Sequence, residues 1–126
     1  MRRQEIGAWG EEVALHHLEA QGYDIRARNW RAPGGEVDLI AQDGDTVVFV
    51  EVKTRTGSRF GTPEEAVTAI KRRRLQRAAW AYLLAHDLLD APWRIDVIAV
   101  DRSAGPGAPR IEHYQDAVDA DPEALP

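Results

Sequence analysis

The stretch GEVDLIAQDGDTVVFVEVK, which begins at Gly35, constrains the fold more than any other part of the chain. It contains two apolar runs of strand-like composition separated by a short polar segment that includes Asp-Gly. Asp-Gly between two such runs is the strongest short-range signal for a β-hairpin. The chain is therefore expected to contain an antiparallel strand pair whose open end carries charged residues.

The hairpin register follows from the loop length. A two-residue loop at residues 43–44 predicts that Glu36 lies opposite Glu51. The same register places Asp38 opposite Phe49. Because strand side chains alternate between faces, one face is expected to carry all of the following residues: Glu36, Asp38, Ile40, Val47, Phe49, Glu51 and Lys53.

The rest of the chain alternates between helical and strand-like patterns. Helices are expected over residues 4–21 and after a TPEE capping box at residues 62–65, with a break near Lys71 where the apolar stripe rotates. Further strands are expected over residues 23–30, 93–100 and 110–114. The order of a helix, three strands, a helix and two strands predicts an α/β fold, with a mixed central sheet flanked by helices.

Composition narrows the class of protein. The 126 residues suit a single domain, with an acidic tail over about residues 117–126 that is expected to fray. The absence of cysteine excludes disulfides and thiolate metal sites. No apolar stretch is long enough for a signal peptide or a membrane span, so we expect no membrane association and a cytoplasmic location.

Charge is unevenly distributed along the chain. The net charge is −5, but residues 53–77 contain eight basic and two acidic residues, a local charge of +6. A basic face and an acidic tail can coexist because charges are screened over roughly 8–10 Å. The basic helix segment IKRRRLQR is either a solvated helix face or a surface that holds phosphates.

The charged face of the hairpin indicates chemistry. Three carboxylates and one ammonium would meet at its open end, and directly opposed like charges destabilise a strand pair. A hard divalent cation would remove that cost, since Mg²⁺ prefers oxygen ligands. On the first helix, Glu11 falls in the apolar stripe and Glu12 points into solvent; alternatively, Glu11 lies at the stripe's edge and extends outward.

These motifs resemble known families. GEVD followed by EVK resembles the nuclease signature PD-(D/E)xK, and the element order resembles the core of the restriction-endonuclease-like fold. The longer pattern WGEEVALHHLEAQGYDIRARNWR, GEVDLIA and VVFVEVKTR resembles the YraN-type family of small bacterial proteins, similar in layout to archaeal Holliday-junction resolvases. One departure is that Val37, not proline, precedes Asp38.

The resemblance implies a role for each matching residue. Asp38 and Glu51 would bind Mg²⁺ or Mn²⁺, and Lys53 would be the catalytic lysine. Glu11, in a G-x-x-x-E spacing after Gly7, would complete both the catalytic and the metal-binding set. Glu36 has no equivalent in the signature, and we expect it either to support the metal ligands or to have a structural role. The residues expected to contact nucleic acid are Thr54, Arg55, Lys71, Arg72 and Arg74.

The expected function is Mg²⁺-dependent endonucleolytic cleavage of nucleic acid, DNA in preference to RNA, with branched DNA of the Holliday-junction type as a candidate substrate. The alternative is a nucleic-acid-binding or protein-interaction module that retains the fold without turnover. A resolvase-like enzyme cuts two strands symmetrically, which implies a homodimer.

Outside these motifs the sequence assigns no chemistry. The four histidines lack zinc-ligand spacing and are expected at the surface or at strand edges. Asp96 interrupts an apolar strand, where it is expected only to hydrogen-bond a neighbour.

Overall fold

The computed structural model describes residues 2–55, 67–102 and 107–118. The described elements are α1 (Arg3–Ala20), β1 (Asp24–Ala32), β2 (Gly35–Asp43), β3 (Thr46–Arg55), α3 (Ala69–Ala85), β4 (Trp93–Asp101) and β5 (Arg110–Tyr114). The expected α/β class and element order are confirmed. The capping box at residues 62–65 lies outside the described residues. Within the described residues α3 begins at Ala69, close to the expected break near Lys71, and the side chain of Thr68 accepts a hydrogen bond from the Lys71 backbone N–H and caps it. The helical segment expected before the break lies outside the described residues.

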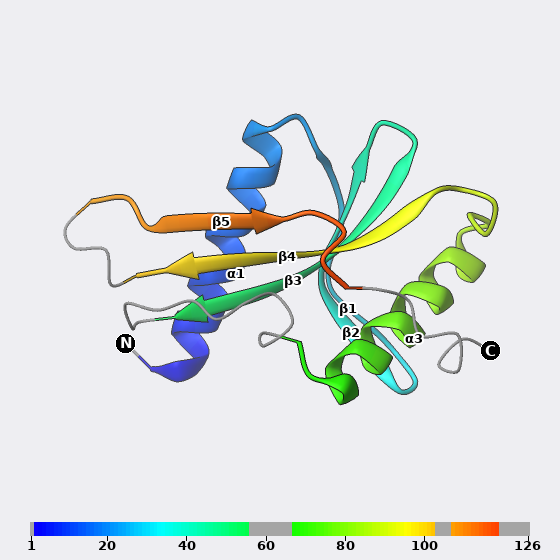
Figure 1. The fold of residues 1–126 in the computed structure, drawn as a ribbon, viewed down its shortest axis with the longest axis horizontal. Coiled ribbons are helices and arrows are strands. Elements are labelled where there is room, and N and C mark those ends of the chain that lie inside the picture. Colours follow the sequence, from blue (N-terminus) through cyan, green and yellow to red (C-terminus); the bar gives the residue numbers. More distant parts are fainter. Residues whose placement is uncertain (1, 56–66, 103–106, 119–126) are drawn as a thin grey trace.

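The five strands form one mixed sheet in the order β1-β2-β3-β4-β5. Only β3 and β4 run parallel; every other neighbouring pair is antiparallel. A parallel pair needs a long crossover connection, and α3 lies within the segment that joins β3 to β4. Figure 1 shows α1 passing behind β3, β4 and β5, with α3 below the other end of the sheet.

The expected hairpin register is wrong by two residues. Asp43 pairs with Thr46, so the loop is Gly44-Asp45, and Ile40 rather than Asp38 lies opposite Phe49. Gly44 takes a positive φ of 59° at the first loop position, as in a type II′ turn. Because the error is an even number of residues, every side chain stays on its expected face.

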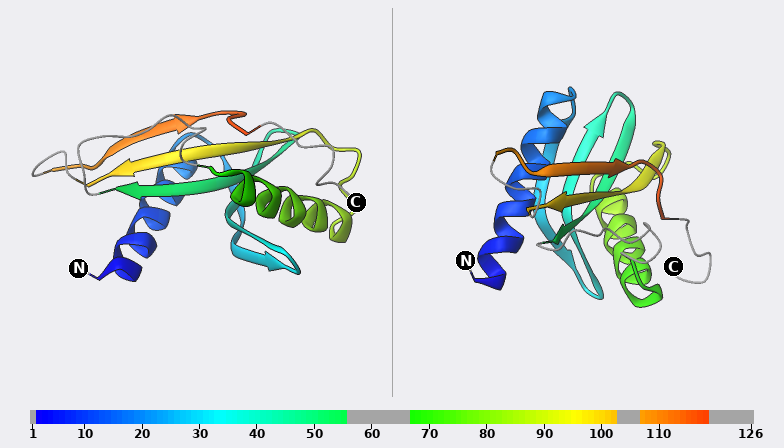
Figure 2. Two further views of the ribbon diagram at one scale, coloured as in Figure 1. Left: turned by 60° about the horizontal axis from the view of Figure 1, so that its bottom comes forward. Right: turned by 60° about the vertical axis from the view of Figure 1, so that its left-hand side comes forward.

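The strands β2 and β3 separate beyond the pair Leu39–Val50, the last one between them. The remaining residues of β2 pair only with β1, up to Ala32 opposite Gly35. Figure 2 shows the β1–β2 hairpin leaving β3 and standing between α1 and α3. The predicted pairing of Glu36 with Glu51 is therefore absent, and Asp38 and Glu51 lie at the fork between the two strands.

Two apolar clusters cover the two faces of the sheet. One packs α1 through Ala14, Leu15 and Leu18 against one face, and the other packs α3 against the opposite face, which includes Ile40, Val47 and Phe49. Val118 belongs to the α3 cluster, and the N–H of Ala117 donates to the Ile95 carbonyl at 2.9 Å. The frayed tail is expected from about residue 117, but Ala117 and Val118 pack on the core.

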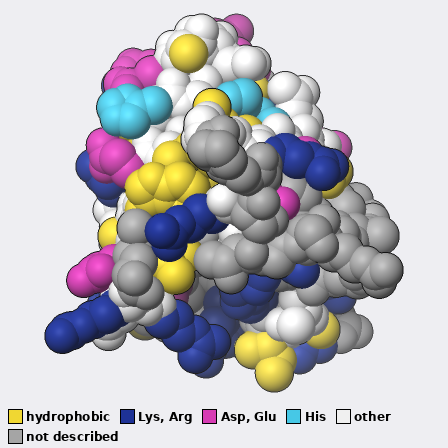
Figure 3. All heavy atoms as spheres, turned by 90° about the vertical axis from the view of Figure 1, so that its left-hand side faces the viewer, with side chains coloured by type: hydrophobic (Ala, Val, Ile, Leu, Met, Phe, Trp, Pro, Cys, Tyr) yellow, Lys and Arg dark blue, Asp and Glu magenta, His cyan; other side chains and the backbone are white. Residues whose placement is uncertain are grey.

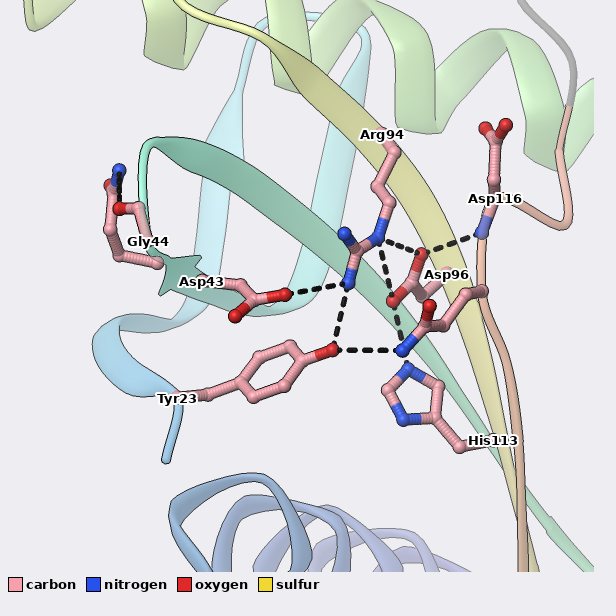
Figure 4. Close-up of polar contacts among 9 residues, drawn as sticks. Tyr23, Asp43, Gly44, Arg94, Asp96, His113 and Asp116 are labelled. Atoms are coloured by element: carbon pink, nitrogen blue, oxygen red, sulfur yellow. Dashed lines mark hydrogen bonds and ion pairs between the residues drawn. The ribbon is translucent and has the colours of Figure 1, made fainter. Parts of the chain in front are cut away.

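A buried polar cluster joins β4 to β5 and to the residues that follow β5. The fully buried Asp96 carboxylate accepts hydrogen bonds from Arg94 at 3.0 Å, His113 at 2.8 Å and the Asp116 backbone N–H at 2.8 Å (Figure 4). The Arg94 guanidinium also donates to the hydroxyl of Tyr23 at 2.7 Å. Burial raises the pKa of Asp96, but the three donors outweigh burial and lower it. His113 lies on the edge strand β5 as expected, yet its side chain points inward.

Candidate functional site

A cavity of about 480 Å³ opens at the fork between β2 and β3. Strand residues form its floor, α1 bounds one side and α3 the other. Its lining consists of Arg3, Ile6, Gly7, Glu11, Glu36, Asp38, Glu51, Val52, Lys53, Thr54, Lys71, Arg74 and Leu75. The structure therefore brings together in one place all four residues expected to be catalytic.

Asp38 and Glu51 form the centre of the cavity. One Asp38 carboxylate oxygen accepts a hydrogen bond from the Val52 backbone N–H at 2.8 Å, which fixes the side chain toward β3. Asp38 is also hydrogen-bonded to the Glu51 carboxyl group. Burial, followed by repulsion from Glu51, raises the pKa of Asp38 to about 8, while the Val52 hydrogen bond opposes that rise. With a pKa of about 8, the Asp38 carboxyl group keeps its proton at neutral pH.

Glu11 reaches the cavity from α1. Its side chain is half-buried, and burial raises its pKa, with smaller contributions from the charges of Glu51 and Glu36. A hydrogen bond with Asn29 on β1 acts in the opposite direction. Its neighbour Glu12 does not simply face solvent, because it pairs with Arg28 at 2.7 Å.

Two lysines flank the carboxylates. The Lys71 ammonium donates to a Glu51 carboxylate oxygen at 3.1 Å, so Lys71 is tied to the centre of the site rather than to its edge. Burial lowers the pKa of Lys53 the most, and the positive charges of Lys71 and Arg55 lower it further. A lysine of lowered pKa is a better proton acceptor than an ordinary one.

The remaining predicted residues divide into two groups. Thr54 and Arg74 line the cavity, whereas Arg55 and Arg72 do not. Glu36 lines the cavity from an exposed position and pairs with Arg31 at 3.4 Å.

Sequence reasoning missed one cationic residue of the lining. Arg3 precedes Glu11 by eight residues, with Gly7 between them, so the three recur every four residues along α1. Residues at this spacing lie on one helix face. The spacing could have identified Arg3 once Glu11 was assigned to the site.

Two glycines allow the elements to approach closely enough to form the cavity. A Cβ atom at Gly10 would lie 1.9 Å from the Thr54 hydroxyl oxygen, so only glycine lets α1 pack this closely on β3. A Cβ atom at Gly35 would lie 2.0 Å from the Arg74 carbonyl oxygen, so only glycine lets the β1–β2 turn pack on α3. Both contacts are made to residues that line the cavity, Thr54 and Arg74.

Among the described residues that line the cavity, basic side chains are as numerous as acidic ones. Figure 3 faces the end of the molecule where β3 runs out and shows Lys and Arg side chains gathered across its lower half. Positive side chains at the cavity itself are Arg3, Lys53, Lys71 and Arg74. Carboxylates that contact one another fit a cation, and the basic side chains of the same cavity fit a polyanion.

The carboxylates fit a divalent metal ion by their chemistry. Asp38 and Glu51 offer two oxygen-bearing groups in contact, and crowding of like charges would be relieved by a cation. Within residues 2–55, 67–102 and 107–118, no three His, Asp or Glu side chains are grouped closely enough to hold a metal ion by themselves. Such a site would resemble those in which Mg²⁺ keeps several waters and takes one or two carboxylates.

Comparisons with known proteins place the chain among bacterial relatives. Residues 10–100 match the sequence model of the uncharacterised protein family UPF0102. A UPF0102 protein of Beutenbergia cavernae is 53% identical over 113 residues, covering 90% of this chain and 95% of that protein. One of Geobacter sulfurreducens is 48% identical over 112 residues, covering 89% and 87%. One of Symbiobacterium thermophilum is 54% identical over 98 residues, covering 78% and 83%. In the described part of the chain, no helix is long and apolar enough to cross a membrane.

Proposed function

The chain belongs to the uncharacterised protein family UPF0102, the YraN-type family that its motifs resemble, and on this premise we propose that it is a metal-dependent phosphodiesterase acting on nucleic acid. The family name states no reaction, so the proposal rests on the site. The observation that carries it is the contact between Asp38 and Glu51 inside a cavity that also holds Lys53.

Four residues of the cavity carry the chemistry in this proposal. Asp38 and Glu51 would hold the Mg²⁺ or Mn²⁺ ion, and Glu11, which lines the same cavity from α1, would complete the set. When bound, the ion supplies Lewis-acid stabilisation of charge on the phosphate and on the leaving oxygen. Lys53, whose pKa is lowered by burial, accepts a proton from the attacking water or holds it in line with the phosphorus. The bond to the leaving oxygen breaks as the new phosphorus–oxygen bond forms.

The basic residues around the cavity hold the substrate. Lys71 already lies at the carboxylates, and Arg74 follows one helical turn later on α3. Thr54 lines the cavity beside Lys53, where its hydroxyl can donate to a phosphate oxygen. Contacts of this kind bind the backbone without reading sequence, which suits an enzyme that recognises DNA shape, such as a branch point.

The test is cleavage of labelled single-stranded, duplex, flapped and four-way DNA with Mg²⁺ and, separately, with EDTA. The parent is expected to cut at least one substrate only with the metal, and Asp38→Ala and Lys53→Ala are expected to lose activity by at least 100-fold, the order seen for acid–base groups. Asp24→Asn is the matched control, because that carboxylate is exposed on β1 and pairs with Arg26. Equal cutting by the parent and both alanine variants would refute the proposal.

A second candidate is a nucleic-acid-binding module without turnover. It is favoured by the Lys71 ammonium, which pairs with Glu51 and offsets the charge of that carboxylate without a metal ion. This candidate predicts binding that weakens steeply with salt and does not change with EDTA. Calorimetric titration with Mg²⁺ separates the two, since only hydrolysis requires a binding isotherm that Asp38→Asn abolishes.

The proposal also includes an oligomeric state, a homodimer, and a location, the cytoplasm. A symmetric cut at a branch point requires two sites, so we expect a homodimer on DNA, which sedimentation with and without a four-way junction would reveal. The cytoplasm remains the compartment expected from the lack of cysteine.

A further inference from the structure

A second cavity of about 600 Å³ lies between the β1–β2 turn and α3. Its lining consists of Arg31, Ala32, Gly34, Gly35, Glu36, Arg74 and Arg77. Glu36 and Arg74 line the first cavity as well, so the two cavities adjoin. We call the second cavity the arginine pocket.

The turn packs on α3 through its two glycines. Gly35 lies against the Arg74 carbonyl, as described above. Gly34 has a positive φ of 83°, and a Cβ atom there would lie 3.4 Å from Cδ of Arg77. The turn therefore contacts the helix without side chains of its own, and the guanidinium groups of α3 are left beside it to line the pocket.

The charge of the arginine pocket is positive. It holds three guanidinium groups and one carboxylate, and the carboxylate of Glu36 is engaged by Arg31 at 3.4 Å. Among the residues that the structure describes, Arg74 and Arg77 have no acidic partner within ion-pairing distance. Guanidinium groups that have no carboxylate partner can bind phosphate through two parallel hydrogen bonds.

The spacing along α3 connects the pocket to the carboxylates. Lys71, Arg74 and Arg77 recur every three residues. Lys71 contacts Glu51, and Arg77 lines the arginine pocket. Six residues of helix rise about 9 Å. Along the axis of a duplex a strand rises about 3.4 Å per nucleotide, so the same length corresponds to two or three nucleotides when α3 lies along that axis.

We infer that the arginine pocket holds a backbone phosphate of the substrate strand, two or three nucleotides from the phosphate at Asp38 and Glu51. The strand then follows α3 from Lys71 to Arg77, past the β1–β2 turn. This inference rests on the proposed function, because it assigns a path to the same substrate. It adds Arg31 and Arg77 to the residues that bind nucleic acid.

The test measures binding in EDTA, so that it does not depend on cleavage. The double variant Arg31→Gln/Arg77→Gln is compared with the parent by fluorescence anisotropy on labelled single-stranded, duplex and four-way DNA. Losing one phosphate contact is expected to weaken binding roughly 5- to 10-fold at 0.1 M salt. The slope of log affinity against log salt concentration should become shallower by about 0.7 if the pocket binds single-stranded DNA, and by about 0.9 if it binds duplex DNA.

The matched control is Arg26→Gln, an exposed arginine on β1 that pairs with Asp24 and lines neither cavity. It should bind as the parent does. Arg31 is 79% exposed and Arg77 is exposed, so the double variant should unfold at the parent's urea midpoint. Glu36→Gln provides a test of opposite sign, because Glu36 is the one carboxylate among the described residues that line the arginine pocket, and its removal should tighten binding.

The outcomes separate this inference from the proposed function. If the double variant binds with the parent's affinity and salt slope while the parent cleaves DNA, the arginine pocket is refuted and hydrolysis stands. If the double variant binds weakly as expected but the parent cuts nothing, the pocket stands and hydrolysis is refuted. If the parent neither binds nor cuts any of the DNAs, both are refuted.

Discussion

Replacing Asp38 with asparagine is expected to remove a pH-dependent destabilisation that the carboxylates impose on the folded chain. Burial and the Glu51 carboxylate raise the pKa of Asp38 to about 8. An aspartate in an unfolded chain titrates near pH ~3.9. Between these values the folded chain holds one more proton than the unfolded chain. The free energy of unfolding therefore falls as the pH rises, until Asp38 ionises in the folded state.

The size of this effect follows from the pKa shift. One proton corresponds to a slope of about 1.4 kcal/mol per pH unit, so the loss from pH 5 to pH 7 is about 3 kcal/mol. That is a large share of the roughly 5–15 kcal/mol by which domains of this size are stable. Asparagine keeps an oxygen that can accept the 2.8 Å hydrogen bond from Val52 and carries no titrating proton. The Asp38→Asn variant should lack this slope.

The assay is urea unfolding in EDTA at a series of pH values. The difference in unfolding free energy between Asp38→Asn and the parent isolates this carboxyl group, because all other titrating groups are common to both proteins. As the pH rises, the unfolding free energy of the variant should increase relative to that of the parent. Mg²⁺ added to the parent should make this difference smaller. Asp24→Asn, which removes an exposed carboxylate, should give no such trend. A difference that is constant with pH would refute the raised pKa of Asp38.

Three further predictions concern the supports of the site. Gly35→Ala should destabilise the fold by about 1–3 kcal/mol in urea unfolding and weaken DNA binding, because its Cβ atom would meet the Arg74 carbonyl at 2.0 Å. Asp96→Asn should cost about 3 kcal/mol or more, since it leaves Arg94 without its buried partner; an unchanged urea midpoint would contradict this. The lowered pKa of Asp96 means that its contribution is present at neutral pH and lost as the pH falls through the folded-state pKa, so the Asp96→Asn difference should shrink in acid. Lys71→Met should lower stability in EDTA but not in Mg²⁺, since a bound cation would replace the lysine at Glu51; equal losses in both buffers would argue against a metal there.

The parts of the fold that sequence predicts well depend on periodicity. Alternation along β2 and β3 predicts the shared face of Asp38, Glu51 and Lys53, because a strand has only two faces and one of them is buried. The strand over residues 110–114 is found where the pattern places it. The hairpin register is predicted less well than the faces of the strands. It depends on whether glycine takes the first or the second loop position, and that choice changes the residue pairing without changing the composition.

The partners of buried charges could not be predicted, because they come from distant parts of the chain. His113 lies opposite Ile98 on β4, which brings its ring to Asp96 two residues away on the same face. Nothing local to either residue indicates that contact. Likewise, Lys71 appears in the sequence as one of several basic helix residues, and only the packing of α3 against the fork places it on Glu51.

A crystal of the parent grown with Mn²⁺ would test the metal site most directly, through anomalous difference density collected at the manganese edge. We expect one strong peak in contact with carboxylate oxygens of both Asp38 and Glu51, with the Lys71 ammonium no longer on Glu51. The same crystals of Asp38→Asn should lack the peak. Parent crystals that show no peak at saturating Mn²⁺, with Lys71 still bound to Glu51, would contradict a metal-dependent hydrolytic site.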